Sequence, residues 1–275
     1  MKTRIILSLI LVPAFAFFIF FPPSAPFIGL VLLLGMLSVN EVYGMIDKKN
    51  MPSYKLSGII FTFLILLFSI KPNYIANPVA FVLLAFAVFI IFLLTKVILS
   101  KDINNFPKVL NTLFPVIYIA VLGSFTIQLR LMENGYYLIF LLFLYTLVYD
   151  GGAYFAGSFF GKHKLIPEIS PGKSIEGCVG GVIINIITVV IIKYTFLPVD
   201  IFGHNTLLHL IIMAIILSIT GQAGDLAASV IKRFCGVKNS SNLLPEMGGI
   251  LDKIDSTLFN APVLFLYITY IVKLF

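Results

Sequence analysis

The chain has 275 residues, of which 60% are hydrophobic and 11% are charged. A soluble domain carries about 25% charged residues, so this composition excludes one and predicts an all-α, polytopic integral membrane protein. The net charge of +7 does not indicate nucleic-acid binding, because lipid head groups and nucleotides are the better anionic partners for so apolar a chain. Two cysteines, Cys178 and Cys235, are too few for a disulfide framework and have no metal-ligand spacing.

Apolar runs of about 15–22 residues, bounded by charged residues or by Pro, Gly and Asn, predict about nine transmembrane helices. The runs are 5–21, 25–39, 56–70, 79–94, 109–129, 136–148, 178–192, 206–223 and 257–274. The first run is longer than the apolar part of a signal peptide and no small-residue cleavage site follows it, so we expect it to be retained. The third, sixth and seventh runs are short, which leaves their ends and the total count open.

The basic residues predict the orientation of these helices. If the spans alternate, fifteen of the 19 Lys and Arg residues fall on one side of the membrane and four fall on the other. This bias places the N-terminus in the cytoplasm, together with the two long polar loops after the sixth and eighth spans. We therefore expect a multi-pass protein of the cell (inner) membrane with a site that faces the cytoplasm.

The acidic residues are concentrated in the C-terminal half. Seven of the twelve lie in or beside the two long loops, namely Asp150, Glu168, Glu176, Asp225, Glu246, Asp252 and Asp255. Ionisable groups at the ends of membrane spans mark functional sites. The sequence therefore predicts a transmembrane scaffold over residues 1–135 and a catalytic part over residues 136–275, within a single membrane domain.

In the stretch 229–256, cations precede a glycine pair and two acids. The residues concerned are Lys232, Arg233, Lys238, Gly248, Gly249, Asp252 and Asp255. Carboxylates bind hard cations, while Lys, Arg and glycine amides bind phosphate oxygens, so this combination is typical of a site for a polyphosphate and its metal. Asp252 and Asp255 are three residues apart and would share one face of a helix.

Asp225 follows the eighth predicted span, and Lys232 and Arg233 come two helical turns later. A carboxylate at membrane depth must be paired, protonated or bound to a metal. With Asp252 and Asp255 it would suit one or two Mg²⁺ ions that substrate phosphates also bind. The alternative is an ion pair with Lys232 or Arg233.

Two further motifs lie around the first long loop. Asp150 closes the sixth span ahead of small residues that would let helices pack closely, and it either faces the site or is a solvated acid. The segment 170–177, SPGKSIEG, resembles the end of a phosphate-binding loop but lacks the first glycine of a Walker A motif. Its Pro-Gly turn would lead into a helix N-terminus, whose backbone amides, with Lys173 beside them, could bind an anion. The negative charge of Glu176 would interact favourably with the dipole of that helix. An ordinary span start would explain the same residues.

Both blocks resemble the phosphatidate cytidylyltransferase (CDP-diacylglycerol synthase) family. That family's C-terminal signature reads roughly S-x-x-K-R-x4-K-D, a spacer, and P-x-H-G-G-x-x-D-R-x-D. It is matched at Ser229, Lys232, Arg233, Lys238, Pro245, Gly248, Gly249, Asp252 and Asp255. A second block, S-P-x-K-[ST]-x-E-G, is matched at Ser170, Pro171, Lys173, Ser174, Glu176 and Gly177, and a G-D pair at Gly224 and Asp225. The chain departs from the pattern with Asn239 for Asp, Met247 for His and Lys253 for Arg.

The resemblance implies a reaction in which CTP and phosphatidate give CDP-diacylglycerol and pyrophosphate. It implies a metal site at Asp225, Asp252 and Asp255, with two divalent ions or with Mg²⁺ and a monovalent ion, and it adds Lys232 and Arg233 to the catalytic set. The implied substrate-binding residues are Asp150, Ser170, Lys173, Ser174, Glu176, Ser229, Lys238, Gly248, Gly249 and Lys253. The expected partners are CTP, phosphatidate and membrane lipids, with no nucleic acid, and a homodimer is one option for assembly.

Other functions stay open at this point. The chain could be another CTP-dependent lipid-phosphate cytidylyltransferase, or a polyprenol-type kinase that leaves only a phosphate on its lipid. It could also be an inactive membrane paralogue. A transporter would be expected to have charged or broken helices near the membrane midplane in repeated halves, whereas polarity here is confined to one half of the chain.

Overall fold

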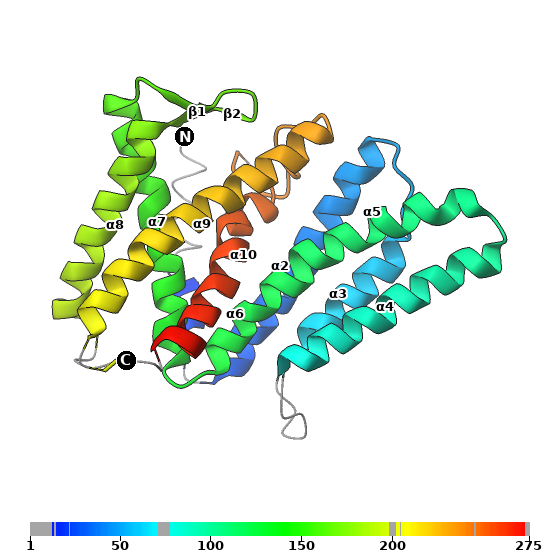
Figure 1. Cartoon of the computed structure of the whole chain (residues 1–275), viewed down its shortest axis with the longest axis horizontal. Helices are drawn as coiled ribbons and strands as arrows, with labels where there is room; N and C mark the ends of the chain where they lie inside the picture. Colours follow the sequence, from blue (N-terminus) through cyan, green and yellow to red (C-terminus); the bar gives the residue numbers. More distant parts are fainter. Residues whose placement is uncertain are drawn as a thin grey trace. The chain divides into compact units, whose positions relative to one another are not determined.

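A computed structural model describes residues 13, 15–21, 23–70, 78–197, 202, 203, 205–244 and 246–272, without the side chains of residues 78–82. Helices dominate this part of the chain (Figure 1). Among the described residues, seven helical segments of at least 18 residues are apolar enough to cross a membrane, and the helix Lys55–Phe68 is apolar but shorter. The predicted class, an all-α polytopic membrane protein, is confirmed.

The helices correspond in order to the second to ninth predicted spans. They are α2 (Ser24–Lys48), α3 (Lys55–Phe68), α4 (Pro78–Ser100), α5 (Phe106–Val116) with α6 (Leu122–Leu131), α7 (Gly135–Phe160), α8 (Ile175–Thr195), α9 (Thr206–Phe234) and α10 (Leu251–Leu266). The first predicted span, 5–21, lies largely outside the described residues. The total of nine and the side of the N-terminus therefore stay predictions.

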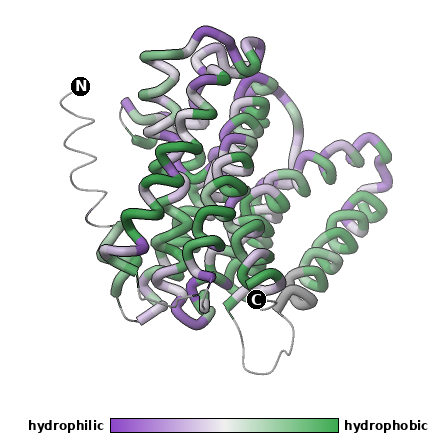
Figure 2. The backbone as a smooth tube through the Cα atoms, turned by 60° about the vertical axis from the view of Figure 1, so that its left-hand side comes forward, coloured by the Kyte–Doolittle hydropathy of each residue, from purple (hydrophilic) through white to green (hydrophobic). Residues whose placement is uncertain are grey.

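Several helices are longer than the apolar runs that predicted them. Hydrophobic residues line the helices, and hydrophilic residues gather towards helix ends and connecting loops (Figure 2). Helix α7 continues to Phe160 and α9 continues to Phe234, so neither helix ends at Asp150 or Asp225, and the position of these acids at the ends of membrane spans stays a prediction. Both acids lie inside helices, because backbone hydrogen bonds extend a helix past its apolar part without any need for lipid.

Two helical runs contain a proline followed by a wider turn. The short helix η1 (Ile103–Asn105) leads into α5, and the π-helical turn η2 (Ile117–Val121) joins α5 to α6 just after Pro115. Helix α10 contains Pro262 and continues into the π-helical turn η3 (Tyr267–Ile271). Proline has no amide hydrogen, and a wider turn is one way in which a helix accommodates the interrupted hydrogen bonding.

A short antiparallel hairpin connects α7 to α8. Its strands are β1 (Lys164–Ile166) and β2 (Ser170–Ser174), and Lys164 lies opposite Ser174. The predicted Pro-Gly turn at the entrance of a helix is therefore wrong, since Pro171 and Gly172 belong to a strand. Ser174 instead begins the helix, because its side-chain oxygen accepts a hydrogen bond from the amide of Gly177 at 3.2 Å.

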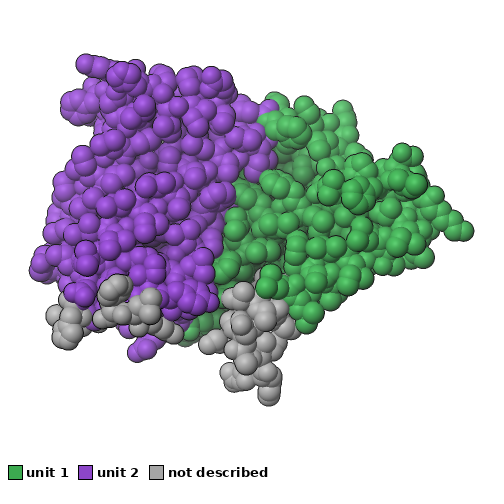
Figure 3. Space-filling model, viewed as in Figure 1, with its two compact units in different colours: residues 1–131, 234–253 green, residues 132–233, 254–275 purple. Residues whose placement is uncertain are grey.

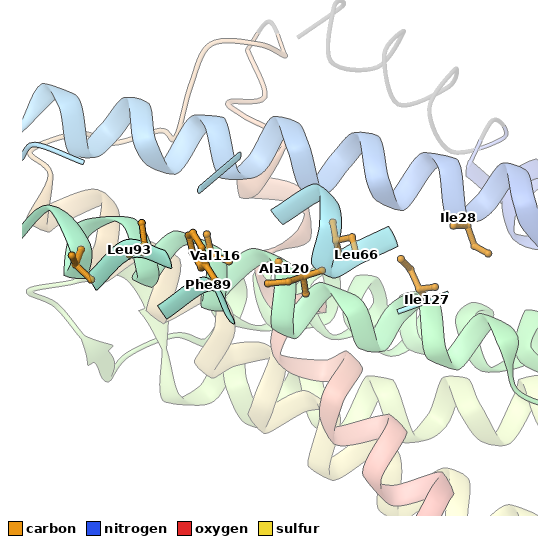
Figure 4. Packing of buried hydrophobic residues seen from close by; sticks show 9 residues of the cluster. Ile28, Leu66, Phe89, Leu93, Val116, Ala120 and Ile127 are labelled. Carbon is orange, nitrogen blue, oxygen red and sulfur yellow. The ribbon is translucent and has the colours of Figure 1, made fainter. Parts of the chain in front are cut away.

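The chain forms two compact units, coloured separately in Figure 3. Unit 1 comprises Met1–Leu131 and Phe234–Lys253, and unit 2 comprises Met132–Arg233 and Ile254–Phe275. A segment late in the sequence thus belongs with the N-terminal helices. The core of unit 1 is an aliphatic and aromatic cluster of Ile28, Ile65, Leu66, Phe89, Leu93, Val109, Val116, Ala120 and Ile127 (Figure 4). The predicted functional division at residue 135 stays a prediction.

In unit 2, small residues bring helices into close contact. A Cβ atom added to Gly177 of α8 would lie 3.1 Å from the Cα atom of Gly157 in α7. One added to Gly181 would lie 3.0 Å from the Cβ atom of Ala153. The small residues that follow Asp150 therefore serve the close packing of α7 against α8, as their small size predicted.

Candidate active site

An ion pair joins the hairpin of unit 2 to helix α9. Nζ of Lys173 in β2 lies 2.6 Å from Oδ2 of Asp225, and their side chains are 20% and 31% exposed. The hydroxyl of Ser229, one helical turn further along α9, lies 3.4 Å from Oδ1 of Asp225. Three predicted site residues from the two sequence blocks are thus in contact. Lys173, from the hairpin, is thus a partner of Asp225, while the ion pair with Lys232 or Arg233 that the sequence left as an alternative stays a prediction.

Asp255, in α10, comes after α9 in the sequence but lies close to this ion pair in unit 2. Its side chain is buried, with 7% exposed, and its Oδ1 accepts a hydrogen bond from the amide of Ser256 at 2.8 Å. A Cβ atom added to Gly224 would lie 2.6 Å from the carbonyl oxygen of Asp255, so α9 and α10 almost touch beside Asp225. Only glycine allows this approach at position 224.

Charges of both signs surround Asp255. Asp225 and Asp150 lie near enough to repel its carboxylate, while Lys232 lies near enough to attract it. Asp150, in α7, is in turn within electrostatic range of Asp225 and Lys173. Carboxylates gathered in surroundings of low dielectric constant repel one another strongly unless cations compensate them. This group in unit 2 is therefore suited to bind further positive charge.

Other predicted site residues, from both sequence blocks, hold the hairpin in place. Glu176, in the first turn of α8, accepts hydrogen bonds from the amides of Lys162 at 3.0 Å and His163 at 3.1 Å, and its carboxylate pairs with the His163 ring. Arg233, at the end of α9, donates from Nε to the carbonyl oxygen of Ile169 at 3.4 Å. Ser170 begins β2, opposite Ile166. These contacts position the strand that carries Lys173.

In unit 1, the signature segment folds around the carboxylate of Asp252. Oδ2 of Asp252 accepts hydrogen bonds from the amide and the hydroxyl of Ser240 and from the amide of Gly249, each at 3.0 Å. Gly248 has a φ of +91°, and reciprocal backbone hydrogen bonds pair it with Leu244. A Cβ atom added to Gly248 would lie 2.6 Å from Oδ2 of Asp252. The close approach to the Asp252 carboxylate explains why glycine is needed here, in addition to the predicted role of the glycine pair in binding phosphate.

One acid in this segment's surroundings was not among the predicted residues. Glu41 of α2 is buried, with 7% exposed, and it accepts hydrogen bonds from Ser240, Ser241 and the first residues of α10. The only signal in the sequence is a lone acid in the apolar region just beyond the second predicted span. Its partners lie about two hundred residues away along the chain, where no periodic pattern connects them to it.

Some predicted residues have a surface position or a simpler role. Lys238 and Lys253 are exposed in unit 1, and Pro245 lies outside the described residues. Both cysteines are free thiols. Burial raises the pKa of the Cys235 thiol above its ordinary value, so it is protonated at neutral pH and packs as a small apolar side chain.

The carboxylates of the candidate site are compatible with a magnesium ion that takes its remaining ligands from the phosphates of a bound substrate. Among the described residues, no three His, Cys, Asp or Glu side chains lie together in a way that could hold an ion by themselves. Mg²⁺ is usually held by one or two carboxylates, with water and substrate phosphates completing the shell. Asp225 and Asp255 supply such a pair of carboxylates in unit 2, whereas Asp252 in unit 1 already has one oxygen engaged by three donors.

Comparison with known proteins identifies the family. The family model for the Cytidylyltransferase family matches residues 2–271. The chain belongs to this family. Two similar relatives of this cytidylyltransferase chain are both named phosphatidate cytidylyltransferase. The protein from Bacillus subtilis (strain 168) is 33% identical over 269 residues, 96% of each chain, and the one from Staphylococcus haemolyticus (strain JCSC1435) is 37% identical over 235 residues, 84% of this chain and 85% of its own.

Proposed function

We propose that this member of the cytidylyltransferase family transfers CMP from CTP to phosphatidate, giving CDP-diacylglycerol and pyrophosphate for phospholipid biosynthesis. The observation that supports the proposal most directly is the ion pair between Lys173 and Asp225. It joins the second sequence block to the G-D pair at one place in unit 2. The names of the full-length relatives support the choice of phosphatidate as the acceptor.

The chemistry needs positioning and charge neutralisation more than proton transfer. A phosphate oxygen of phosphatidate attacks the α-phosphorus of CTP in line, a new P–O bond forms, and the bond to the pyrophosphate leaving group breaks. Phosphatidate is already ionised at neutral pH, so no general base is required. The presence of Met247 where the family pattern has histidine is therefore compatible with activity.

The residues of unit 2 divide this work between them. Asp225 and Asp255 would hold Mg²⁺, which when bound neutralises the triphosphate and orients it. The part of Asp252, in unit 1, as a further ligand stays a prediction from the sequence. Lys173 and Lys232 would bind phosphate oxygens. The 2.6 Å contact of Lys173 with Asp225 keeps the ammonium group at the carboxylate until a substrate phosphate competes for it.

The membrane setting follows from the chemistry of the acceptor. Phosphatidate has its phosphate at the membrane surface and its acyl chains in the bilayer, so it would enter sideways between helices. The bias of basic residues supports a site on the cytoplasmic face of the inner membrane, where CTP is available. Assembly as a homodimer stays a prediction.

The position of a label in CTP tests the proposal. Purified protein with Mg²⁺ and short-chain phosphatidate is given CTP labelled in either the α- or the γ-phosphate, with dCTP and ATP as competing nucleotides. We expect label in the lipid from α-labelled CTP alone. Transfer from the γ-position would show a kinase, transfer only to a different lipid phosphate would show another acceptor, and no transfer to any lipid would show an inactive paralogue; each result would overturn the proposal.

A further inference from the structure

The start of helix α10 is held by a carboxylate from the opposite end of the sequence. Oε1 of Glu41 accepts a hydrogen bond from the hydroxyl of Ser241 at 2.7 Å and one from the amide of Ile250 at 2.9 Å. Oε2 accepts from the hydroxyl of Ser240 and from the amide of Leu251, both at 2.9 Å. Each oxygen of this buried carboxylate therefore has two donors.

This arrangement explains how a buried acid is tolerated. An ionised carboxylate removed from water costs several kcal/mol unless hydrogen bonds replace its hydration. The amides of Ile250 and Leu251 lie at the start of α10, where helical amides have no partner within the helix and the dipole favours negative charge. Glu41, from α2, thus acts as the N-terminal cap of α10.

Glu41 and Asp252 share two neighbours. The hydroxyl oxygen of Ser240 lies 2.9 Å from Oε2 of Glu41 and 3.0 Å from Oδ2 of Asp252, and its single proton serves both. The amide of Gly249 donates to Asp252, while a Cβ atom at Gly249 would lie 2.6 Å from Oε1 of Glu41. A displacement of Glu41 would therefore move two of the groups that fix Asp252.

We infer that Glu41 is a positioning residue for cytidylyl transfer, which acts by holding segment 240–251 so that Asp252 keeps its orientation. This inference rests on the proposed function, because the role of Glu41 matters for catalysis only if Asp252 takes part in holding the metal and the triphosphate. Glu41 itself has its oxygens occupied by four protein donors, so it supports the site without contacting the substrate.

The first test is Glu41→Gln, which keeps the shape but replaces one acceptor oxygen with an amide group that faces a donor. Loss of a group that orients a metal ligand typically lowers metal affinity about 10–100-fold. We expect the Mg²⁺ concentration for half-maximal activity to rise about tenfold or more and the KM for CTP to rise with it. Ser241→Ala, which removes one donor to Glu41, should shift both values in the same direction by less. Asp47→Asn, on the same helix at an exposed ion pair with Lys55, should change neither value.

A second readout does not depend on activity. In the wild type, hydrogen exchange of a peptide that contains Ile250 and Leu251 should be slow, and Glu41→Gln should accelerate it while Asp47→Asn leaves it unchanged. If Glu41→Gln accelerates the exchange but the wild type is inactive, the proposed function is contradicted while the capping of α10 by Glu41 is supported. Unchanged exchange, or a fall in apparent kcat with the Mg²⁺ dependence and the KM for CTP both unaltered, would overturn the positioning role.

Discussion

Lys173 and Asp225 form an ion pair across 52 positions of sequence, with Nζ and Oδ2 2.6 Å apart. One residue lies on a short strand and the other lies inside a membrane-crossing helix. The hairpin is therefore more than a connection between α7 and α8, because it delivers a cation to a carboxylate that lies within electrostatic range of Asp150 and Asp255.

Removal of this cation should impair the reaction more than the fold. Lys173→Ala leaves the carboxylates of unit 2 with less compensating charge and removes a predicted phosphate ligand, so we expect kcat/KM for CTP to fall about tenfold or more. Lys173→Arg should recover part of the loss. Lys164→Ala, an exposed lysine on the neighbouring strand, is the matched control. Equal activities of Lys173→Ala and Lys164→Ala would contradict the role assigned to the ion pair.

The sequence was sufficient for the class of fold and for the order of the helices, because lipid requires long apolar helices and these are visible as apolar runs. It was poor at helix ends. Charged residues such as Lys232 and Arg233 continue α9 beyond its apolar part, and nothing in composition marks where the helix stops. The hairpin was missed because SPGKS contains neither alternation nor β-branched residues.

The site was only partly predictable for a related reason. The sequence motifs identified Lys173 and Asp225 separately, and the small residues after Asp150 indicated a close approach of helices. The contact between Lys173 and Asp225, and the capping of α10 by Glu41, depend on tertiary packing between distant segments. Local periodicity carries no information about such partners.

Close packing of α9 against α10 should be necessary for stability. In Gly224→Ala the new methyl group would collide with the carbonyl oxygen of Asp255, and overpacking of this kind typically costs about 1–3 kcal/mol. Gly151→Ala in α7 has open space around the new atom and should be neutral or stabilising by up to about 1 kcal/mol. Thermal unfolding of both variants in detergent measures the difference. If the Gly224→Ala protein is as stable as the Gly151→Ala protein, α9 and α10 are not in close contact at Gly224.

The glycine before α10 should be equally intolerant. In Gly249→Ala the methyl group would press against the Glu41 carboxylate and the Ser240 hydroxyl, so we expect a loss of stability of about 1–3 kcal/mol. Gly172→Ala, in β2, meets no atom within 4 Å and serves as the control. Thermal unfolding again provides the measurement, and identical midpoints for the two variants would argue against the tight packing around Glu41.

The departure from the family signature at Lys253 should matter little. This residue is exposed, and arginine would keep its charge while adding a two-pronged donor for phosphate. We expect Lys253→Arg to have a kcat/KM for CTP equal to that of the wild type or higher, and a steady-state assay measures it. A collapse of activity would show that the site has adapted to lysine.

The most direct test of the central claim is CMP incorporation into phosphatidate by Asp225→Asn, measured beside the wild type across a range of Mg²⁺ concentrations. The substitution keeps the shape of the side chain but removes the charge that Mg²⁺ and Lys173 would share. The account predicts a Mg²⁺-dependent wild type and a variant that inserts normally into the membrane but is slower by a factor of about 100 or more. Near-normal turnover by the variant, with an unchanged response to Mg²⁺, would contradict it.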